Sequence, residues 1–417
     1  MNTYLPRVAD EELTKKMRST GAVLIEGPKA CGKTATASRI AATTFNMDQD
    51  ATARSSIELN SDYLLDRPTP ILFDEWQVAP HLWTLVRRSV DESEHGRGLY
   101  LMTGSATPRD DATRHSGAGR IGVLRMRPMS LFESGHSSGD VSLSALLDQK
   151  TQTGSGADLS VPDLMQRIVV GGWPDLIGSD EVEARGWIDD YLTQIVEVDI
   201  PSFVGRRDPR LLGRVIASLG RFVAQSPTVT TLAADAGGDR GPIAAATVAS
   251  HLDALARLGL IDDSDAWQPH MRSRSRLRTT PTRYFVDPSL GTAALHVGSA
   301  DLLNDLPAAG FHFEALVLRD LRIYAQPLGG RVDTWRDENG NEVDAVVSLP
   351  DGRWAAIEVK MNQSAVDLAA ANLKRFTQRV DLDRHGQPAA LIVITATGPA
   401  GRRADGVTVT PITALRP

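Results

Sequence analysis

The feature that most constrains this chain is an eight-residue loop that follows a short apolar run. The loop reads Gly27-Pro28-Lys29-Ala30-Cys31-Gly32-Lys33-Thr34 and matches the pattern G-x-x-x-x-G-K-[ST] at every fixed position. Residues 22–26 before it predict a buried parallel strand, and residues 36–44 after it predict a helix. Such a loop wraps a phosphate, its lysine offsets the β/γ-phosphate charge, and its threonine can hold Mg²⁺. The sequence therefore predicts a phosphate-binding strand–loop–helix unit.

A second apolar run, residues 70–73, ends in Asp74-Glu75. An acid at the tip of a strand beside a phosphate loop holds the Mg²⁺ shell, so we assign this role to Asp74, together with Thr34. The next residue, Glu75, is then placed to orient or deprotonate the attacking water. An acidic pair at the start of a helix over residues 76–90 is the alternative interpretation.

A third apolar run, residues 98–102, ends in Thr103-Gly104-Ser105. We assign Ser105 to the nucleotide site because a hydroxyl there can reach the γ-phosphate or the water, although a plain turn has the same pattern. Four arginines follow within a Gly/Ser-containing segment: Arg114, Arg120, Arg125 and Arg127. We assign Arg120 as an arginine finger, acting in cis or from a neighbouring subunit of a homo-oligomer; a solvated arginine is the alternative.

The order of these elements resembles that of bacterial and archaeal AAA-type ATPases. More narrowly, it resembles a family in which such a domain is fused to a C-terminal domain of unknown function. The resemblance is carried by the phosphate loop, LFDEWQ (72–77), LMTGS (101–105), GAGRIGVLRMRPMSL (117–131), GGWP (171–174) and the 191–200 stretch. It implies an ATP-binding domain that uses Mg²⁺ and in which Lys33, Asp74 and Glu75 are catalytic.

Composition sets the remaining limits. The chain has 417 residues, which suggests about two to four domains, and a net charge of -7. This balance excludes a globally basic nucleic-acid coat protein, and no apolar run approaches the roughly 18 residues of a membrane span. Charges throughout the first twenty residues and a single cysteine predict a cytoplasmic protein.

The middle of the chain predicts a connector and a winged helix. Ser/Gly-rich residues 134–158 bound the ATPase domain, giving domains at 1–135, 136–208 (linker and helical connector) and 209–300 (winged-helix-like). Helical patterns over residues 210–224, 230–236 and 242–258 precede a strand at 283–287. A polar segment before that strand carries Arg272, Arg274, Arg276, Arg278 and Arg283. We expect this segment to contact DNA or RNA backbone; a mobile solvated loop is equally compatible.

In the last domain, residues 301–417, the sequence pattern predicts a helix, three strands, a helix and a strand. The elements are placed at residues 310–321, 332–335, 341–347, 353–360, 364–380 and 389–394. Alternation puts Glu358 and Lys360 on one face of a strand beside Asp344, and Glu314 comes from the helix. Three carboxylates and a lysine are what a Mg²⁺-dependent phosphodiester hydrolase needs, so we assign all four as catalytic and the acids as metal ligands.

This arrangement resembles the PD-(D/E)xK nuclease superfamily, although Val343 stands where the namesake proline is found. The alternative interpretation is an exposed ion pair between Glu358 and Lys360 that has no catalytic role. The sequence thus predicts a multidomain α/β protein: an AAA-type P-loop domain, a winged-helix connector and a restriction-endonuclease-like α/β domain. ATP would control a metal-dependent nuclease acting on nucleic acid. The other hypothesis is an ATP-switched DNA- or protein-binding regulator whose nuclease-like domain is inactive.

Overall fold

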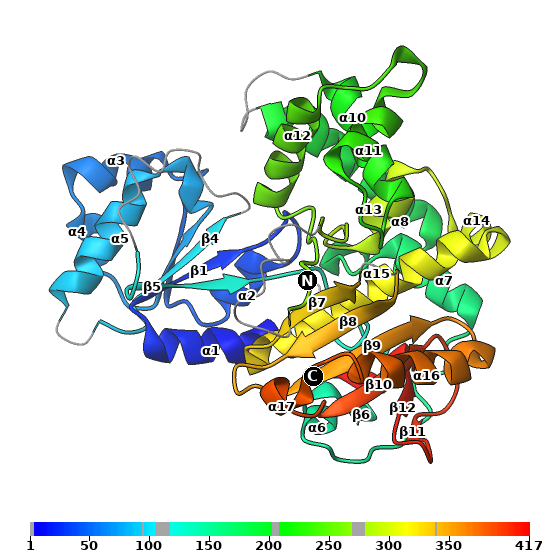
Figure 1. The fold of residues 1–417 in the computed structure, drawn as a ribbon. Coiled ribbons are helices and arrows are strands. Elements are labelled where there is room, and N and C mark those ends of the chain that lie inside the picture. The colour runs from blue at the N-terminus through cyan, green and yellow to red at the C-terminus, as the bar shows by residue number, and fades with distance from the viewer. Residues whose placement is uncertain (1–3, 94–95, 105–116, 202–207, 269–279, 338–339) are drawn as a thin grey trace. The chain divides into compact units, whose positions relative to one another are not determined.

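The computed structural model describes residues 4–93, 96–104, 117–201, 208–268, 280–337 and 340–417 (Figure 1). The chain divides into two units, residues 1–128 with 254–260 and residues 129–253 with 261–417. The first boundary therefore falls after Pro128, seven residues before the predicted one at 135.

A parallel five-stranded sheet of order β2-β3-β4-β1-β5 forms the first unit. Its strands are β1 (Ala22–Glu26), β2 (Thr43–Asn46), β3 (Ile71–Asp74), β4 (Tyr100–Gly104) and β5 (Ile121–Arg125). Strand β4 lies between β1 and β3, so Thr103 near its end sits beside the ends of both neighbours. Because the carboxyl ends of parallel strands share one edge, the phosphate loop, Asp74 and Thr103 meet there.

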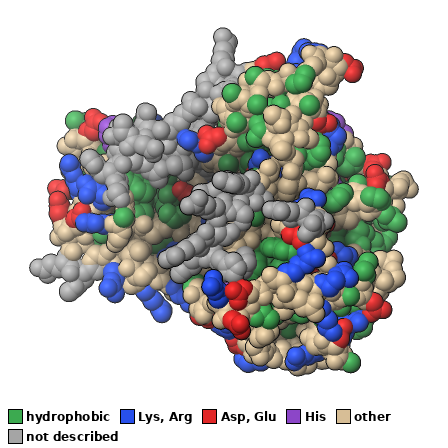
Figure 2. All heavy atoms as spheres, viewed as in Figure 1, with side chains coloured by type: hydrophobic (Ala, Val, Ile, Leu, Met, Phe, Trp, Pro, Cys, Tyr) green, Lys and Arg blue, Asp and Glu red, His purple; other side chains and the backbone are tan. Residues whose placement is uncertain are grey.

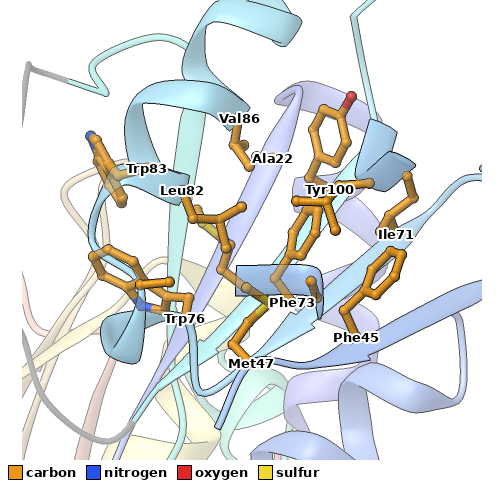
Figure 3. Close-up of a cluster of buried hydrophobic side chains, with 14 of the residues drawn as sticks. Ala22, Phe45, Met47, Ile71, Phe73, Trp76, Leu82, Trp83, Val86 and Tyr100 are labelled. Atoms are coloured by element: carbon orange, nitrogen blue, oxygen red, sulfur yellow. The ribbon is translucent and has the colours of Figure 1, made fainter. Parts of the chain in front are cut away.

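Helices cover both faces of this sheet. One face carries α1 (Ala9–Ser19) and α2 (Lys33–Ser38), and the other carries α3 (Ala51–Leu59), α4 (Asp62–Leu65) and α5 (His81–Glu92). Successive residues of β1 divide between the two cores: Leu24 packs with Phe73 and Trp76, whereas Ile25 packs with Leu13. Figure 3 shows the first of these clusters, in which Trp76 and Trp83 lie 5.4 Å apart between ring centroids. The apolar runs are therefore buried on both faces, as parallel strands require.

Two helix predictions in this unit were wrong in their extent. The helix expected over residues 36–44 ends at Ser38, and residues 43–46 form β2, where β-branched threonines pair with β3. The helix expected over residues 76–90 is a 3-10 turn, Trp76–Val78, followed by α5. Pro80 immediately precedes α5 and favours a helix start at that point.

A mixed six-stranded sheet of order β11-β12-β10-β9-β8-β7 organises the C-terminal part of the second unit. Its strands are β7 (Arg331–Arg336), β8 (Glu342–Ser348), β9 (Trp354–Lys360), β10 (Ala390–Thr395), β11 (Gly401–Arg402) and β12 (Thr408–Pro411). Strands β7, β8 and β9 are antiparallel neighbours, whereas β10 runs parallel to β9. Helix α15 (Leu306–Ala325) precedes β7, and α16 (Val366–Thr377) connects β9 to β10 and packs on the sheet. This is the predicted order of helix, three strands, helix and strand; the short helix α17 (Leu382–His385) and strands β11 and β12 were not predicted.

The middle of the second unit is helical. Its helices are α7 (Val161–Val170), α8 (Glu181–Gln194), α10 (Pro209–Arg221), α11 (Val229–Gly237), α13 (Pro288–Ala294) and α14 (Ser299–Asn304). Helix α12 (Ala245–Arg257) begins in this unit, and its last residues belong to the first unit. Helices α10 to α12 lie where three helices were predicted. Antiparallel bridges then join Ile261 to Phe285 and Ser264 to Thr282. The winged-helix assignment itself stays a prediction.

The segment predicted as a linker is bonded to the end of the chain. Within it, β6 (Val141–Ser142) leads into α6 (Leu143–Leu147) and pairs in parallel with β13 (Leu415–Arg416). The backbone N–H groups of Ser138 and Ala157 both donate to the carbonyl of Thr413, at 2.8 and 3.0 Å. A Ser/Gly-rich composition indicates a segment with little regular secondary structure, but it does not show which backbone groups that segment hydrogen-bonds. This stretch is thus part of the C-terminal fold.

A buried ion triad holds the second unit together. The Arg319 guanidinium donates to Asp287 at 2.8 Å and to Asp320 at 2.9 Å, and all three side chains are almost fully buried. Burial alone would lower the pKa of Arg319, but the charges of Asp320 and Asp287 outweigh it and raise the pKa. The carboxylates also accept backbone N–H groups from elsewhere in the chain: Gly172 bonds Asp287 at 3.0 Å and Leu131 bonds Asp320 at 2.9 Å.

The Gly171-Gly172-Trp173 motif has a structural explanation in the same place. A Cβ atom on Gly172 would lie 2.0 Å from the carbonyl oxygen of Met129, whose N–H donates to the Gly172 carbonyl at 2.6 Å. The Trp173 indole donates to Ser289 at 3.0 Å, and Ser289 in turn donates to Asp287. A glycine at 172 is therefore needed for backbone to pack directly on backbone.

We predict that Arg319→Met lowers the free energy of unfolding of the second unit by about 3–5 kcal/mol, because it leaves two buried carboxylates without their cation. Urea unfolding followed by tryptophan fluorescence measures the loss. The control Arg221→Met breaks an exposed pair with Asp235 and should cost at most about 1 kcal/mol. Equal losses in the two variants would contradict the role given to the triad.

Candidate functional site

The loop between β1 and α2 has the geometry of a phosphate cradle. Gly32 has φ 98°, and a Cβ on Gly27 would lie 2.3 Å from the carbonyl oxygen of Met126, so both positions need glycine. The Lys33 ammonium is buried and donates to the carbonyls of Gly27 and Pro28, at 3.0 and 2.8 Å. Its positive charge is thus held inside the loop, where a phosphate would meet it.

Asp74 lies where the loop and two strands meet. The Thr34 hydroxyl donates to Asp74 Oδ1 at 2.8 Å, and the Thr103 hydroxyl donates to the same oxygen. The structure brings Lys33, Thr34 and Asp74 together as predicted. The hydroxyl and the carboxylate are hard oxygen donors, which suits Mg²⁺ bound mainly through phosphate and water. Ser105, the hydroxyl that we assigned from the sequence, lies outside the described residues, and Thr103 of the same tripeptide is the one that contacts Asp74.

Glu75 follows in a left-handed conformation, with φ 53°. Its carboxylate accepts a hydrogen bond from the side-chain amide of Gln77. Sequence reasoning did not single out Gln77, although it lies within LFDEWQ. The amide fixes the direction of a carboxylate that is predicted to orient water.

The assignment of Arg120 as a finger acting in cis was wrong. Arg120 precedes β5 at the strand's amino end, where Ile121 pairs with Ala22, whereas the phosphate loop begins after Glu26. A strand of five residues, about 15 Å, separates the two ends. The guanidinium instead pairs with Asp91 of α5 at 2.7 Å. A role in trans, in a homo-oligomer, stays a prediction.

The carboxylate site of the second unit lies at the ends of β8 and β9. Lys360 Nζ lies 2.7 Å from Glu358 Oε2 and 3.2 Å from Asp344 Oδ2, so one ammonium bridges both acids. Asp344 Oδ2 also accepts the backbone N–H of Val359 at 2.7 Å, because strand pairing between β8 and β9 stops at Ala345. The carboxylate therefore takes the place of a strand carbonyl, and this fixes it beside β9.

Glu358 is 3% exposed, and the side-chain amide of Asn372 on α16 bonds its other oxygen. Burial, helped by the charge of Asp344, raises the pKa of Glu358 to about 7. The same two acids raise the pKa of Lys360 against the effect of burial. The Glu358 carboxylate is buried while the Lys360 side chain is partly exposed, so the pair is not the exposed one of the alternative interpretation. The sequence did not predict Asn372 as part of this site, because its position within α16 does not show which strand its side chain faces.

Glu314 has a partner that the sequence did not reveal. The Tyr284 hydroxyl, from the segment after the predicted wing, donates to Glu314 Oε1 at 2.5 Å. Burial and the nearby charge of Asp344 raise the pKa of Glu314 well above its usual value. Only the tertiary fold shows this pairing, since thirty residues separate the two side chains.

A cavity of about 380 Å³ adjoins these acids. Glu314, Glu342 and Asp344 contribute to its wall, together with Tyr284. Among the described residues, no group of three or more His, Cys, Asp or Glu side chains is arranged to hold a metal ion. Asp344 and Glu358 alone still suit Mg²⁺, which is often bound through one or two carboxylates plus water and phosphate oxygens. The predicted metal role of Glu314 stays a prediction.

The predicted nucleic-acid loop is only partly described. Arg272, Arg274, Arg276 and Arg278 lie outside the described residues. Arg283 was wrongly assigned to it, because this side chain is buried and paired with Asp263. On the surface that Figure 2 shows, Lys and Arg side chains are interspersed with Asp and Glu side chains.

Family models match three consecutive parts of the chain. Residues 19–134 match a family described as an AAA domain. Residues 19–134 form an AAA-type P-loop ATPase domain. Residues 161–301 match a domain of unknown function (DUF8612), and residues 309–415 match another (DUF4143). No curated protein matches the chain.

Two of the solved structures that are similar to the chain resemble it only weakly. A Walker-type ATPase of Pyrococcus abyssi is 12% identical, with 69% of this chain and 94% of that chain covered and a TM-score of 0.41. A signal transduction ATPase with numerous domains, with a tetratricopeptide repeat sensor, from Pyrococcus horikoshii is also 12% identical. Here 78% of this chain and 48% of that chain are covered, with a TM-score of 0.25. Separately, none of the helices in the described part of the chain has the length and apolar character needed to cross a membrane.

We predict that Lys33→Ala weakens ATP binding by about 10- to 100-fold, because a charged hydrogen-bond donor to the phosphates is lost. Titration with a fluorescent ATP analogue measures the affinity. Lys15→Ala is the control, since Lys15 is an exposed lysine of the same unit that lies on α1, outside the loop. Equal affinities for the two variants would remove Lys33 from the nucleotide site.

We predict that Glu358 makes stability pH-dependent. Its folded-state pKa of about 7 lies above the unfolded value of about 4.3, so the stability contribution of the bound proton is present at low pH and lost as pH rises through 7. Between pH 5 and pH 8 the free energy of unfolding of the natural chain should fall by up to about 3 kcal/mol more than that of the Glu358→Gln variant. Urea unfolding at each pH measures this difference. Glu342→Gln, an exposed acid on β8, is the control, and the same profile in both variants would refute the assignment.

Proposed function

We propose that this protein binds and hydrolyses ATP in its AAA-type domain and uses the nucleotide state to control a metal-dependent phosphodiester hydrolase site in its C-terminal domain. Nucleic acid would be the substrate. The observation that carries the proposal is the group formed by Asp344, Glu358 and Lys360, which lies at the ends of two adjoining strands and beside a cavity.

The chemistry of the C-terminal group supports hydrolysis. Asp344 and Glu358 would hold Mg²⁺, which when bound lowers the pKa of a water and neutralises the scissile phosphate. The Lys360 ammonium lies within 3.2 Å of both acids and is positioned to orient that water or to steady developing charge. The order of α15, β7, β8, β9, α16 and β10 also agrees with the resemblance to PD-(D/E)xK nucleases.

The ATPase half of the proposal rests on the N-terminal site. Lys33 would contact the β/γ-phosphates, and Thr34 with Asp74 would hold Mg²⁺. Thr103 fixes the Asp74 carboxylate, and Gln77 fixes the Glu75 carboxylate that would orient the attacking water. These are the groups that phosphoryl transfer to water requires.

The polypeptide connects the two units at several points, and this supports control of one site by the other. The chain passes between the two units at three points, after residues 128, 253 and 260. The second of these points lies within α12, a continuous helix. A rearrangement in the first unit would therefore act on the second through several connections. We propose that the protein resides in the cytoplasm and that Arg120, if it acts on ATP, does so in a homo-oligomer.

A second candidate function is an ATP-switched DNA- or protein-binding regulator with an inactive nuclease-like domain. The pairing of Glu314 with Tyr284 favours it, because it engages the third acid that we assigned as a metal ligand. In this function Glu358 and Lys360 would be a structural ion pair.

We predict that Glu358→Ala abolishes cleavage and leaves ATP turnover close to that of the natural chain. Cleavage of plasmid DNA, single-stranded DNA and RNA with Mg²⁺ or Mn²⁺, with and without ATP, measures the first activity; phosphate release measures the second. Lys33→Ala should lose ATP turnover and any effect of ATP on cleavage. Asp351→Ala, in the exposed turn between β8 and β9, is the control. Clear ATP turnover without cleavage of any substrate would favour the regulator.

A further inference from the structure

The cavity beside the carboxylate site has an aromatic wall as well as an acidic one. Phe222, Phe311 and Trp335 line it together with Glu314 and Asp344. Trp335 also packs on Phe376 of the core, with ring centroids 4.7 Å apart, so its ring is held in place. Flat apolar rings next to phosphate chemistry are suited to bind a nucleobase, since every base can stack on an aromatic face.

Phe311 is the aromatic residue most directly linked to the acids. It lies three residues before Glu314, so both side chains project from the same face of α15. Phe311 as a whole residue is 38% exposed although it lines the cavity wall. An exposed aromatic ring at this position is available to stack on a ligand that also reaches the acids.

The size of the cavity restricts what can enter. A volume of about 380 Å³ is at the small end of the roughly 300–1,000 Å³ of ligand pockets, which suits one small ligand. Residues 224–227 and Thr282 also line the cavity, and hydrogen bonds from Ala224 to Arg283 and between Ser226 and Thr282 tie these two stretches together. A continuous duplex is too wide to enter a hollow of this size, and enzymes that act on a base inside such a pocket use single strands or extruded nucleotides.

We propose that this cavity admits one unpaired nucleotide of a DNA or RNA strand, so that the carboxylate site acts on single strands or strand ends and not on continuous duplex. The inference rests on the proposed function and specifies its substrate. The described residues of the cavity wall include three acids and one arginine, Arg336. A strand phosphate would therefore need a divalent cation to offset the acids, and binding should be stronger with Ca²⁺ than with EDTA.

The test measures binding and cleavage with the same oligonucleotides. Fluorescence anisotropy of the full chain with Ca²⁺ compares labelled single-stranded DNA, single-stranded RNA, a blunt duplex and a duplex with an unpaired 3′ end. We expect both single strands and the duplex with an unpaired 3′ end to bind at least about 10-fold tighter than the blunt duplex. Phe311→Ala should weaken their binding by about 5- to 100-fold through lost stacking, and Phe311→Trp should restore it.

Phe132→Ala is the matched control, since Phe132 has nearly the same exposure, 37%, and lies on another segment of the same unit. Its binding should equal that of the natural chain. Equal or tighter binding of the blunt duplex, or equal effects of the Phe311 and Phe132 variants, would overturn the inference.

Cleavage of the same oligonucleotides with Mg²⁺ separates the two proposals. If the chain binds single strands preferentially through Phe311 but cleaves none of them, the cavity assignment stands and the hydrolase is rejected. Cleavage of blunt duplex as fast as of single strands rejects the cavity assignment and retains the hydrolase. A chain that binds none of the four nucleic acids overturns both.

Discussion

The buried guanidinium of Arg319 is the constraint on which the second unit depends. A charge removed from water costs several kcal/mol unless carboxylates and hydrogen bonds compensate it, so Asp287 and Asp320 must both be present and correctly placed. Backbone N–H groups also donate to these carboxylates, Leu131 to Asp320 and Gly172 to Asp287. Two distant stretches of chain are therefore fixed against α15 by one charge. This explains why a Gly-Gly-Trp motif far from any catalytic group has a defined place in the fold.

The same triad also positions the candidate carboxylate site. Asp287 and Tyr284 belong to one short segment, and their partners Arg319 and Glu314 belong to one helix. Two parallel links, one ionic and one a hydrogen bond, thus join this segment to α15. The middle part of the chain, which matches one family of unknown function, supplies a side chain to the acids of the part that matches another. The wall of the cavity is built from both, so neither part forms the cavity alone.

What the sequence could predict follows from how local each feature is. The phosphate loop, Asp74 and the strand carrying Glu358 and Lys360 were predicted because spacing within a few residues determines them. Contacts between distant segments could not be predicted in this way. The hydrogen bond from Tyr284 to Glu314 is one example. The wrong assignment of Arg120 is another, since the register of β5 against β1 decides which edge of the sheet the arginine occupies.

Charge balance links the C-terminal geometry to the proposed chemistry. Lys360 supplies one positive charge to two acids, and burial, helped by the charge of Asp344, still raises the pKa of Glu358. The second carboxylate is ionised more readily when a further cation is near. Within the group of Asp344, Glu358 and Lys360, a divalent cation alone would leave one excess positive charge, which a phosphodiester would then neutralise. The group is therefore balanced when metal and phosphate are bound together, and this is the state in which a phosphodiester hydrolase must act.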